Sequence, residues 1–593
     1  MINKLKRHYF HSDIYRYINH IQISVIVGVV AGMGAVLFHY LLERMRNFFE
    51  PHRFKALLGV PDYYVIMIPV IGGLICATMT WFFPLIAREK GVMSVIRAVL
   101  LKNGFIPIKE TIFHLFAPII AIGTGAPLGP EGPAAKIGGG IGSYLSQLMK
   151  LNKNDMVMYT AAGGGAAIAA AFNAPIAGVF FGIEVILLND LKNRALSALI
   201  ISSVVADIIS RSLLGDVSVF RIPVYTTGDY FSYFFYVVLG VLCGLVSLFY
   251  FYMSDKIEYI FDEKFKLTNP YIRLIPVTFI FGLILLKYYT LFGIGYNTID
   301  SLIHGSFTRT DIFVLLFLKV ALLALFVQAG AYGGTFAPSL VIGALLGYVF
   351  SDTVNLFFHT GLDPVAFALA GMGGVLAGIN SIPLTAILLV FEVTNDYRFI
   401  LPLMLVSIIS HLVLLYRKKM SIYTQELMDD NIDVSKRAEV DILSRIEAGE
   451  ILKTDMDVVS YRTPFRELLE VILNAKYGDL FVVDDMNRFI GIITFKDIRQ
   501  ALMDNDLTDL LIANDLIMDI PVITPHEPLS SAIEKVRQYD IENIPVVIPE
   551  NNNQLEGIIT RKDMIDAYNR IMKNIGESEY LTGSSSNKGG GLI

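Results

Sequence analysis

Charged residues and cysteines are scarce in this chain of 593 residues. Asp, Glu, Lys and Arg together make up 17% of it, whereas soluble domains carry about 25%. The two cysteines, Cys76 and Cys243, lie in different apolar segments and indicate neither a disulfide framework nor a metal site. No nucleophile–base arrangement, metal-ligand cluster or phosphate-binding glycine loop is visible in the sequence. We therefore expect no enzyme activity and no required cofactor.

Most of the chain is apolar. Hydrophobic residues make up 54% of the chain, and the mean hydropathy is +0.56. Charges are sparse from residue 21 to about 416 and dense from Arg417 onward, which predicts a membrane domain followed by a soluble one. The first span is expected at Ile21–Leu42. Many later apolar segments are shorter than a bilayer or interrupted by Gly and Pro, a pattern typical of discontinuous helices around a midplane site.

Basic residues flank the apolar region on both sides. They lie at Lys4, Lys6, Arg7 and Arg16 before it and at Arg417, Lys418 and Lys419 after it. By the positive-inside tendency, this predicts an integral multi-pass protein with both termini in the cytoplasm, and the cell membrane as its location. Residues 1–20 are then a cytoplasmic N-terminal segment, and their basic, polar character predicts no cleavable signal peptide.

A Gly- and Pro-rich stretch at residues 125–138 separates two apolar segments and contains the carboxylate of Glu131. Irregular backbone at membrane depth is tolerated only beside protein or a water-filled cavity, and an ionisable residue there indicates a functional site. The prolines and glycines also fit a helix start, whose free N–H groups and positive dipole end hold anions. The alternative is that Glu131 only caps a buried helix N-terminus.

An internal repeat relates the two halves of the apolar region. Gly163 stands twelve residues before Pro175, as Gly371 does before Pro383, and each proline is followed nine residues later by a glutamate, Glu184 and Glu392 respectively. Corresponding breaks in two halves indicate a binding site at the interface between repeats. Chance similarity between small-residue segments is the alternative, and the matching offsets argue against it.

Three motifs resemble signature segments of the CLC family of chloride channels and chloride/proton antiporters: Gly-Pro-Glu-Gly-Pro at 129–133, Phe-Asn-Ala-Pro-Ile-Ala-Gly at 172–178, and Gly-Gly-Thr-Phe-Ala-Pro at 333–338. The resemblance covers residues 21–425. It implies an all-α polytopic membrane domain built from two inverted repeats of broken helices. It also implies a homodimer of independent pores in a lipid bilayer, which conduct chloride or another small anion coordinated by helix N-termini.

The resemblance also assigns roles to individual residues. Glu131 is similar to the family's gating glutamate, a carboxylate that occupies the anion's place and leaves when it is protonated or displaced. The positions matching the anion-binding segments are Lys90, Gly91, Val92, Gly129, Pro130, Gly132, Thr335, Phe336 and Tyr423. Without the family pattern, Tyr423 would be interpreted as an aromatic residue of the membrane interface.

Three positions depart from the family pattern. Lys90 replaces a serine expected to donate to the central anion; its ammonium either strengthens anion attraction in the pore or extends to cytoplasmic water. Pro130 replaces an arginine beside the gate. Val185 replaces the glutamate that takes protons from the cytoplasm in the antiporters, which favours passive anion conduction, with the neighbouring Glu184 as a substitute proton carrier if protons are coupled.

The soluble region holds a second repeat. Gly-Ile-Ile-Thr-Phe-Lys-Asp at 491–497 matches Gly-Ile-Ile-Thr-Arg-Lys-Asp at 557–563, and each follows an apolar run typical of a strand. This pattern resembles a pair of CBS domains, an α/β fold, at 451–508 and 509–573. The resemblance implies adenine-nucleotide binding (ATP, ADP or AMP) at Thr494, Asp497, Thr560 and Asp563. Alternatively, these residues only cap the following helices. Residues 426–450 are expected to form a linker and residues 574–593 a disordered tail.

These observations predict CLC-type anion transport, by a gated channel, with regulation by adenine nucleotide at the CBS pair. The first alternative is a proton-coupled chloride/anion antiporter on the same scaffold. The second is a membrane-tethered nucleotide sensor with a poorly conducting pore. Protons are a possible second transported species, and we expect no nucleic-acid partner.

Overall fold

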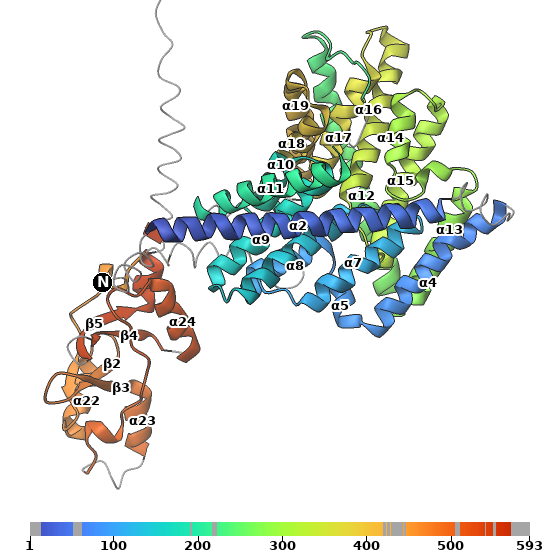
Figure 1. The fold of residues 1–593 in the computed structure, drawn as a ribbon. Coiled ribbons are helices and arrows are strands. Elements are labelled where there is room, and N and C mark those ends of the chain that lie inside the picture. Colours follow the sequence, from blue (N-terminus) through green and yellow to red (C-terminus); the bar gives the residue numbers. More distant parts are fainter. Residues whose placement is uncertain are drawn as a thin grey trace, which may run out of the picture. The chain divides into compact units, whose positions relative to one another are not determined.

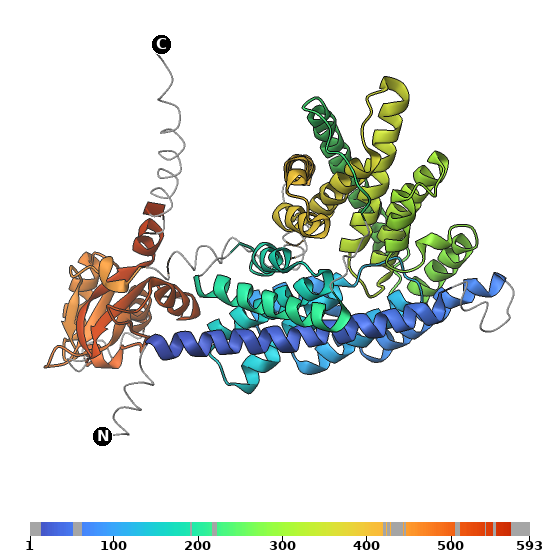
Figure 2. The same cartoon turned by 45° about the horizontal axis from the view of Figure 1, so that its top comes forward.

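The computed structural model describes residues 13–50, 62–189, 193–215, 222–418, 423, 427, 443, 446–503, 510–539, 541–549, 553–567 and 569–570. Most of the expected linker at 426–450 and all of the expected tail at 574–593 lie outside these residues. The chain divides into two compact units, Met1–Glu426 and Leu427–Ile593. Figure 1 and Figure 2 show the two units in two views, coloured along the sequence.

The first unit is helical. Its first half contains α2 (Asp13–Phe49), η1 (Asp62–Ile66), α4 (Met67–Phe82), α5 (Pro84–Arg88), α6 (Gly91–Leu101), α7 (Ile108–Gly123), α8 (Glu131–Leu148), α9 (Lys153–Phe172), α10 (Pro175–Phe181), η2 (Gly182–Ile186) and α11 (Asn193–Leu214). Its second half contains α12 (Ser232–Glu258), η3 (Tyr259–Lys264), α13 (Pro270–Leu285), η4 (Tyr289–Leu291), α14 (Tyr296–Ile303), α15 (Arg309–Ala329), α16 (Phe336–Phe358), α17 (Pro364–Asn380), α18 (Pro383–Thr394), η5 (Tyr397–Phe399) and α19 (Ile400–Lys418).

Long and short helices alternate in this unit. Among the described residues, seven helices are long and apolar enough to cross a membrane, and α6, α13, α17 and α18 are shorter apolar helices. The expected span Ile21–Leu42 is the middle of α2. Prolines begin three of the shorter helices: Pro175, Pro364 and Pro383 each occupy the first turn of a helix, where a missing N–H costs nothing. The predicted helical membrane domain of broken helices is confirmed.

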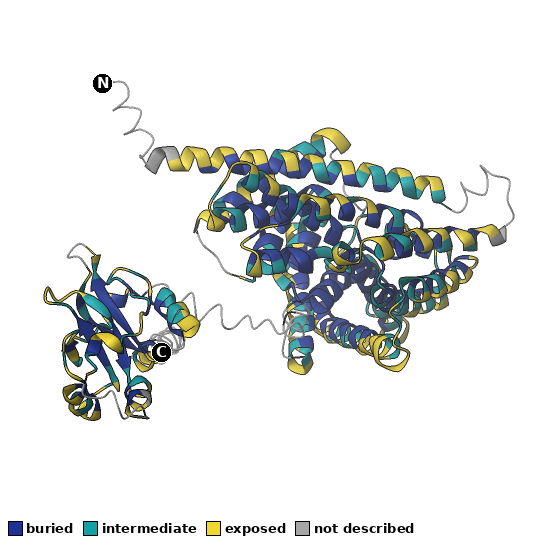
Figure 3. Cartoon of the chain, turned by 90° about the horizontal axis from the view of Figure 1, so that it is seen from below, coloured by how far each residue is buried: buried dark blue, intermediate teal, exposed yellow. Residues whose placement is uncertain are grey.

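Burial follows the pattern expected of a helical membrane protein. Figure 3 shows buried residues concentrated in the interior of the helical unit and exposed residues along one side of the long helix α2. That exposed side is apolar, with Ile21 and Leu37 each 49% exposed. An apolar exposed face is stable against lipid tails but not against water. The interior, by contrast, combines many small residues (Gly, Ala and Ser) with larger aliphatic and aromatic side chains.

Glycines let corresponding helices of the two halves cross at close range. A side chain at Gly163 in α9 would meet the carbonyl of Gly138 in α8, and a side chain at Gly371 in α17 would meet that of Gly343 in α16. Each contact is reciprocal. Close approach through small residues is the usual way for membrane helices to associate. The crossings α8–α9 and α16–α17 therefore make the predicted repeat visible in three dimensions.

The second unit contains two small sheets. β1 (Val458–Ser460) pairs in parallel with β2 (Asp479–Val483), β2 pairs antiparallel with β3 (Phe489–Thr494), and β4 (Asn543–Ile548) pairs antiparallel with β5 (Gln554–Thr560). The helical elements are η6 (Ala448–Glu450), α22 (Phe465–Asn474), α23 (Phe495–Met503), η7 (Ala513–Asp515) and α24 (Leu529–Tyr539). The repeated threonines end β3 and β5, and a helix follows each, so the predicted mixed α/β pattern is confirmed.

The glycine crossings generate the first prediction. Gly163→Ala and Gly371→Ala should each lower the thermal midpoint of the purified protein, because the new methyl group would collide with a backbone carbonyl that cannot rotate away. Gly164→Ala is the matched control, since its methyl group would first meet the flexible end of Ile186. Equal midpoints for Gly163→Ala and Gly164→Ala would contradict the close-packed crossing.

Candidate functional site

Two Gly-rich loops from opposite halves of the helical unit meet in a short antiparallel bridge. Gly129 and Gly334 exchange two backbone hydrogen bonds, with N–O distances of 2.8 Å and 2.6 Å. Directly after this bridge, α8 begins at Glu131 and α16 begins at Phe336. The bridge therefore brings together two helix N-termini, which carry unpaired N–H groups and the positive ends of two helix dipoles.

A third helix start joins them. A side chain built on Gly132 would contact the Cα atoms of Gly334 and Gly91 at 3.5 and 3.7 Å. Gly91 has a positive φ of 52° and opens α6, with Val92 following it. The predicted anion-binding positions around Gly91, Gly132 and Thr335 are thus close in space, although they lie far apart in the sequence.

Glu131 lies at the centre of this arrangement. It is 0% exposed, and the Tyr296 hydroxyl donates a hydrogen bond of 3.4 Å to its Oε1. The atoms nearest to a side chain built on Gly129 would be Glu131 Oε2 and the backbone nitrogen of Ala337. The carboxylate therefore folds over Gly129 toward the first turn of α16, a position in which an anion would be held by backbone N–H groups.

A cavity of about 400 Å³ leads to Glu131. One wall is a stripe of α2 that carries His39, Glu43 and Arg46. Glu43 lies 3.3 Å from Arg46 and 3.8 Å from His39. Pro130 also lines this cavity and carries no charge. A cation is nevertheless present on the cavity wall, because Arg46 of α2 lines it as well.

Lys90 precedes α6 and is half-buried. Its ammonium donates to the carbonyl of Gly330 and lies 5.0 Å from the centre of the Tyr332 ring. Both partners belong to the segment that leads from α15 to Thr335. Of the two interpretations of Lys90, these contacts favour an ammonium held against the pore-forming loop, because a side chain reaching for bulk water would extend away from it.

The other predicted anion-site residues differ in their surroundings. The Thr335 hydroxyl is directed to the side-chain oxygen of Asn380 in α17. The buried ring of Phe336 packs edge-on against Phe181 at 5.7 Å. Tyr423 is a half-buried helical residue, but its sequence neighbours at 421–422 and 424–426 lie outside the described residues, so its role in anion binding remains a prediction.

The two glutamates of the internal repeat cap each other's helices. Glu392, in α18, accepts hydrogen bonds from the N–H groups of Ile176 and Ala177 at the start of α10, at 2.9 and 2.7 Å. Glu184, in η2 directly after α10, accepts from the N–H groups of Leu384 and Thr385 at the start of α18, at 3.1 and 2.8 Å. The end of each segment thus meets the start of the other, so the two run antiparallel.

This pairing bears on the expected proton path. The Thr385 hydroxyl also donates to Glu184, at 2.7 Å, so Glu184 accepts three hydrogen bonds at a helix start. These three donors hold the carboxylate at the helix start. Val185, beside it, is completely buried and carries no proton. Glu184 is therefore held as a helix cap, which argues against its use as a substitute proton carrier.

In the second unit, the repeated Thr and Asp residues bond to each other. The Thr494 hydroxyl donates to Asp497 at 2.6 Å and the Thr560 hydroxyl donates to Asp563 at 2.7 Å. Each pair stands at the start of a helix, as the capping alternative predicted. Asp563 also accepts a hydrogen bond of 2.6 Å from Lys453.

The Lys453 contact lowers the pKa of Asp563. Partial burial acts to raise the pKa of this carboxyl, but the hydrogen bonds from Lys453 and Thr560 outweigh it and leave the pKa below its ordinary value of 3.8. Lys453 also lies 5.7 Å from the centre of the Tyr477 ring. A cation, a carboxylate and an aromatic face therefore come together at the second repeat.

Some residues of this arrangement were not anticipated from the sequence. Tyr296 and Arg46 reach the Glu131 site from segments that carry no motif, and only the fold brings them there. The capping partnership of Glu184 and Glu392 had a signal in the sequence, the equal spacing from Pro175 and Pro383, but the spacing does not show that each glutamate serves the other half.

Comparisons with known proteins support both units. Residues 73–415 match the family of voltage-gated chloride channels, and residues 448–504 and 513–570 each match the CBS domain. The chain is 30% identical to chloride channel protein CLC-f of Arabidopsis thaliana over 82% of this chain and 70% of that protein. It is 34% identical to the H(+)/Cl(−) exchange transporter ClcA of Vibrio cholerae over 49% of this chain and 64% of that protein.

Solved structures share the fold. A slow cyanobacterial Cl−/H+ antiporter aligns with a TM-score of 0.64 at 24% identity, covering 69% of this chain and 97% of that one. A eukaryotic CLC transporter aligns with a TM-score of 0.62 at 18% identity, covering 93% of this chain and 99% of that one. The second alignment extends over both units of the chain.

The reciprocal caps generate the second prediction. Glu184→Ala and Glu392→Ala should each lower the stability of the protein by about 1–2 kcal/mol, because each leaves the first N–H groups of a helix without their side-chain acceptor. The stabilities of the variants and the wild type are compared by thermal or chemical unfolding followed by circular dichroism. Exposed Glu263→Gln is the control. A Glu184→Ala protein as stable as the wild type would contradict the capping role.

Proposed function

The chain belongs to the CLC family of chloride channels and transporters and carries a C-terminal CBS pair, and from this premise we propose that it conducts chloride passively through a gated pore. The observation that carries the proposal is the position of Glu131. Its carboxylate lies beside the N-terminus of α16, where a permeating anion would be bound, and at the end of the cavity lined by α2. An anion can take that position only when the carboxylate leaves it.

The chemistry of the site fits conduction. Helix N-termini hold an anion without a fully charged side chain in contact, so binding is favourable but exchange stays fast. Glu131 repels anions while it is ionised and stops doing so when it is protonated or displaced. It therefore acts as the gate in this proposal, and Tyr296 steadies its closed position through the hydroxyl contact.

Two observations favour passive conduction over proton coupling. Val185 cannot carry a proton, and Glu184 is engaged by three donors at the start of α18. In this proposal, no carboxylate at positions 184–185 passes protons between the cytoplasm and Glu131, so chloride movement is not coupled stoichiometrically to proton movement.

A proton-coupled chloride antiporter is the second candidate. It is favoured by the similarity to an H(+)/Cl(−) exchange transporter and by the cavity that leads to Glu131. His39 and Glu43 line that cavity, and both side-chain types exchange protons readily. In this candidate, protons reach Glu131 through the cavity and continue by a route that does not include position 185.

Lys90 is proposed to tune the anion preference of the pore. Its ammonium stands on the segment leading to Thr335, near the convergence of α6, α8 and α16. A fixed positive charge there raises the local anion concentration and slows anion release. Tyr423 is proposed to donate its hydroxyl to the same anion.

The CBS pair is proposed to bind an adenine nucleotide that regulates the pore. Thr494, Asp497, Thr560 and Asp563 are the proposed contacts. Lys453 is added to them because its ammonium, held by Asp563, is suited to a phosphate group. The Tyr477 ring beside it offers a face on which an adenine can stack.

The assembly and orientation follow the family pattern in this proposal. The protein forms a homodimer with one pore in each subunit, and it lies in the cell membrane with both termini in the cytoplasm. Basic residues at both ends of the apolar region support that orientation.

Anion flux from liposomes tests the main proposal and is the third prediction. Wild-type protein should release chloride without stoichiometric proton movement, and Glu131→Gln should increase the rate several-fold because the neutral side chain no longer repels the anion. The measurement records external chloride and internal pH together, with exposed Glu263→Gln as the control. Proton uptake coupled to chloride and abolished by Glu131→Gln would instead establish the antiporter.

The same assay tests Lys90. Lys90→Ser should change the ratio of chloride to nitrate and fluoride flux, whereas Lys102→Ser, on an exposed lysine paired with Glu89, should not. Unchanged flux ratios in Lys90→Ser would show that Lys90 does not act on the permeating anion. Absence of flux for every anion, with nucleotide binding intact, would favour the sensor hypothesis.

Nucleotide binding to the full-length protein is the fourth prediction. Asp563→Asn should weaken ATP, ADP or AMP binding about fivefold or more, the effect of losing one good hydrogen bond, and Asp485→Asn at an exposed site should not. Because the folded pKa of Asp563 is lowered, its ion pair with Lys453 is complete above about pH 4 and is lost as the pH falls through that pKa. Asp563 itself should therefore add no pH dependence to the affinity between pH 5 and 8, where only the terminal phosphate of the nucleotide still titrates. Wild-type affinity in Asp563→Asn would contradict the assignment.

A further inference from the structure

The centre of α15 contains a lysine that the anion path described above does not use. α15 is long and apolar enough to span a membrane, and Lys319 stands at its midpoint. The side chain of Lys319 is 0% exposed. A charged group in the middle of a membrane-spanning helix is costly, and a helix that retains one usually does so for a function. Packing alone therefore does not explain this lysine.

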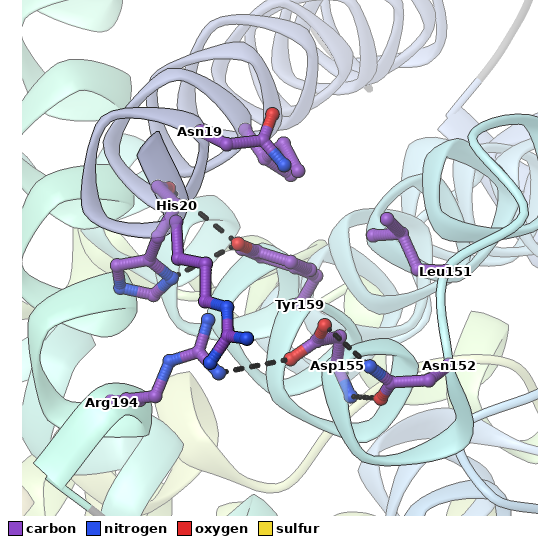
Figure 4. Close-up of a pocket in the computed structure, with 9 residues that line it drawn as sticks. Asn19, His20, Leu151, Asn152, Asp155, Tyr159 and Arg194 are labelled. Carbon is purple, nitrogen blue, oxygen red and sulfur yellow. Dashed lines mark hydrogen bonds and ion pairs between the residues drawn. The ribbon is translucent and has the colours of Figure 1, made fainter. Parts of the chain in front are cut away.

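A buried histidine elsewhere in the helical unit shows how such polar groups are usually satisfied. His20 lines a cavity of about 350 Å³ together with Arg16 and Arg194, and Figure 4 shows its ring facing Tyr159. One ring nitrogen lies 3.0 Å from the Tyr159 hydroxyl and the other lies 2.8 Å from the Ser197 hydroxyl. Both polar atoms of the imidazole are therefore engaged by side chains, and the contacts hold α2 against α9 and α11.

The two buried lysines Lys136 and Lys319 differ in their partners. Lys136 of α8 is 1% exposed, and its ammonium pairs with Glu110 at 3.0 Å. Among the residues that the structure describes, Lys319 pairs with no carboxylate, and it donates a hydrogen bond of 3.3 Å to the backbone carbonyl of Ile294. A buried ammonium without a counter-charge is destabilising, and an apolar side chain of similar volume would cost less. The informative feature is therefore the carbonyl that the ammonium holds.

The Ile294 carbonyl belongs to a short loop that precedes α14. A side chain built on Gly295 would meet the Lys319 ammonium at 2.9 Å and Val341 of α16 at 3.1 Å. Gly295 also has a positive φ of 97°, which residues with a side chain rarely adopt. The ammonium thus lies directly against the backbone of this loop, and the glycine leaves it room to do so.

The same loop borders the Glu131 site. Ile294 and Tyr296 line the cavity that leads to Glu131, and the Tyr296 hydroxyl donates to the Glu131 carboxylate at 3.4 Å. The loop is also joined to the stretch that contains Glu131, because the Gly293 N–H donates to the carbonyl of Gly125 at 2.9 Å. The backbone at residues 293–296 therefore contacts both the Glu131 site and the buried ammonium of α15.

We propose that Lys319 is a positioning residue of the gate. Its ammonium holds the Ile294 carbonyl, which fixes the loop before α14 and keeps the Tyr296 hydroxyl over Glu131. Since Ile294 and Tyr296 are only two residues apart, a displacement of the carbonyl moves the tyrosine with it. Lys319 itself touches no permeating anion. Its role rests on the proposed function of Glu131 as the gate, and it sets how strongly the closed position is held.

Chloride flux from liposomes measures this role in the full-length protein. Lys319→Met removes the ammonium and keeps a side chain of similar length. The loop then loses its contact with α15, so the chloride rate should rise about twofold or more. Tyr296→Phe, which loses the hydroxyl contact itself, should raise the rate by a similar factor. Lys287→Met, at an exposed lysine directly after α13, is the matched control and should conduct as the wild type does.

Combined variants distinguish a positioning residue from one that only supports the fold. If Lys319 acts through Tyr296 on Glu131, Lys319→Met should add nothing to the rate of Tyr296→Phe or of Glu131→Gln. A residue that shaped the pore or the fold would change the rate by the same factor in every background. Lys319→Gln, which is neutral and one bond shorter, serves in the same comparisons if Lys319→Met does not fold.

Three outcomes would overturn the assignment of Lys319. An unchanged or lower rate in Lys319→Met, with a raised rate in Glu131→Gln, would exclude Lys319 and leave the gate in place. An equal factor in the wild-type and Glu131→Gln backgrounds would mean that Lys319 does not act on the gate. A rate that does not rise in Glu131→Gln itself would contradict the proposed gate, and the role of Lys319 with it.

Discussion

The membrane unit depends on a physical constraint: helix N-termini have to meet inside the protein without side chains between them. Gly129 and Gly334 bond backbone to backbone, and Gly91 and Gly132 approach the same point. The absence of side chains at these positions lets α6, α8 and α16 direct their N-termini into a common space. A site with partial positive charge results, and Glu131 is the anionic group that occupies it. The access cavity, the Tyr296 contact and the position of Lys90 are all arranged around that space.

The two halves of the unit are held in register by contacts of the same kind. Glu184 and Glu392 each place a carboxylate on the first N–H groups of a helix from the other half. A carboxylate at a helix start thus serves structure at one place in the molecule and, in our proposal, gates transport at another. The two kinds of site differ in how the carboxylate is held: the capping glutamates accept two or three hydrogen bonds of 3.1 Å or less, whereas the Tyr296 hydroxyl donates to Glu131 at 3.4 Å. A weakly held carboxylate can leave its position, and a gate requires that freedom.

Charged side chains also gather at places other than the helix N-termini around Glu131. Arg46 faces the cavity that leads to Glu131, whereas Arg16 and Arg194 border a cavity at the other end of the same helix, α2. In the second unit, Lys453 and Asp563 pair beside Tyr477. Asp563 belongs to the repeated motif, whereas the cations Arg46, Arg16, Arg194 and Lys453 lie outside the sequence motifs. In our proposals, the Glu131 site binds a permeating halide and the Lys453–Asp563 cluster binds a nucleotide phosphate.

The sequence by itself determined the fold class, the CBS pair and the broken helices, and it identified Glu131 as a candidate site residue. These features depend on local chemistry: apolar runs, glycines and prolines at helix starts, and a costly carboxylate in an apolar context. It also carried the repeat, through the equal spacing of Pro175–Glu184 and Pro383–Glu392. Only the tertiary structure decided that Glu184 caps the opposite half, that Lys90 turns to Gly330 rather than to water, and that Tyr296 and Arg46 reach the Glu131 site. Those contacts join residues far apart in the chain, and their partners depend on how helices cross, a property that no local pattern encodes.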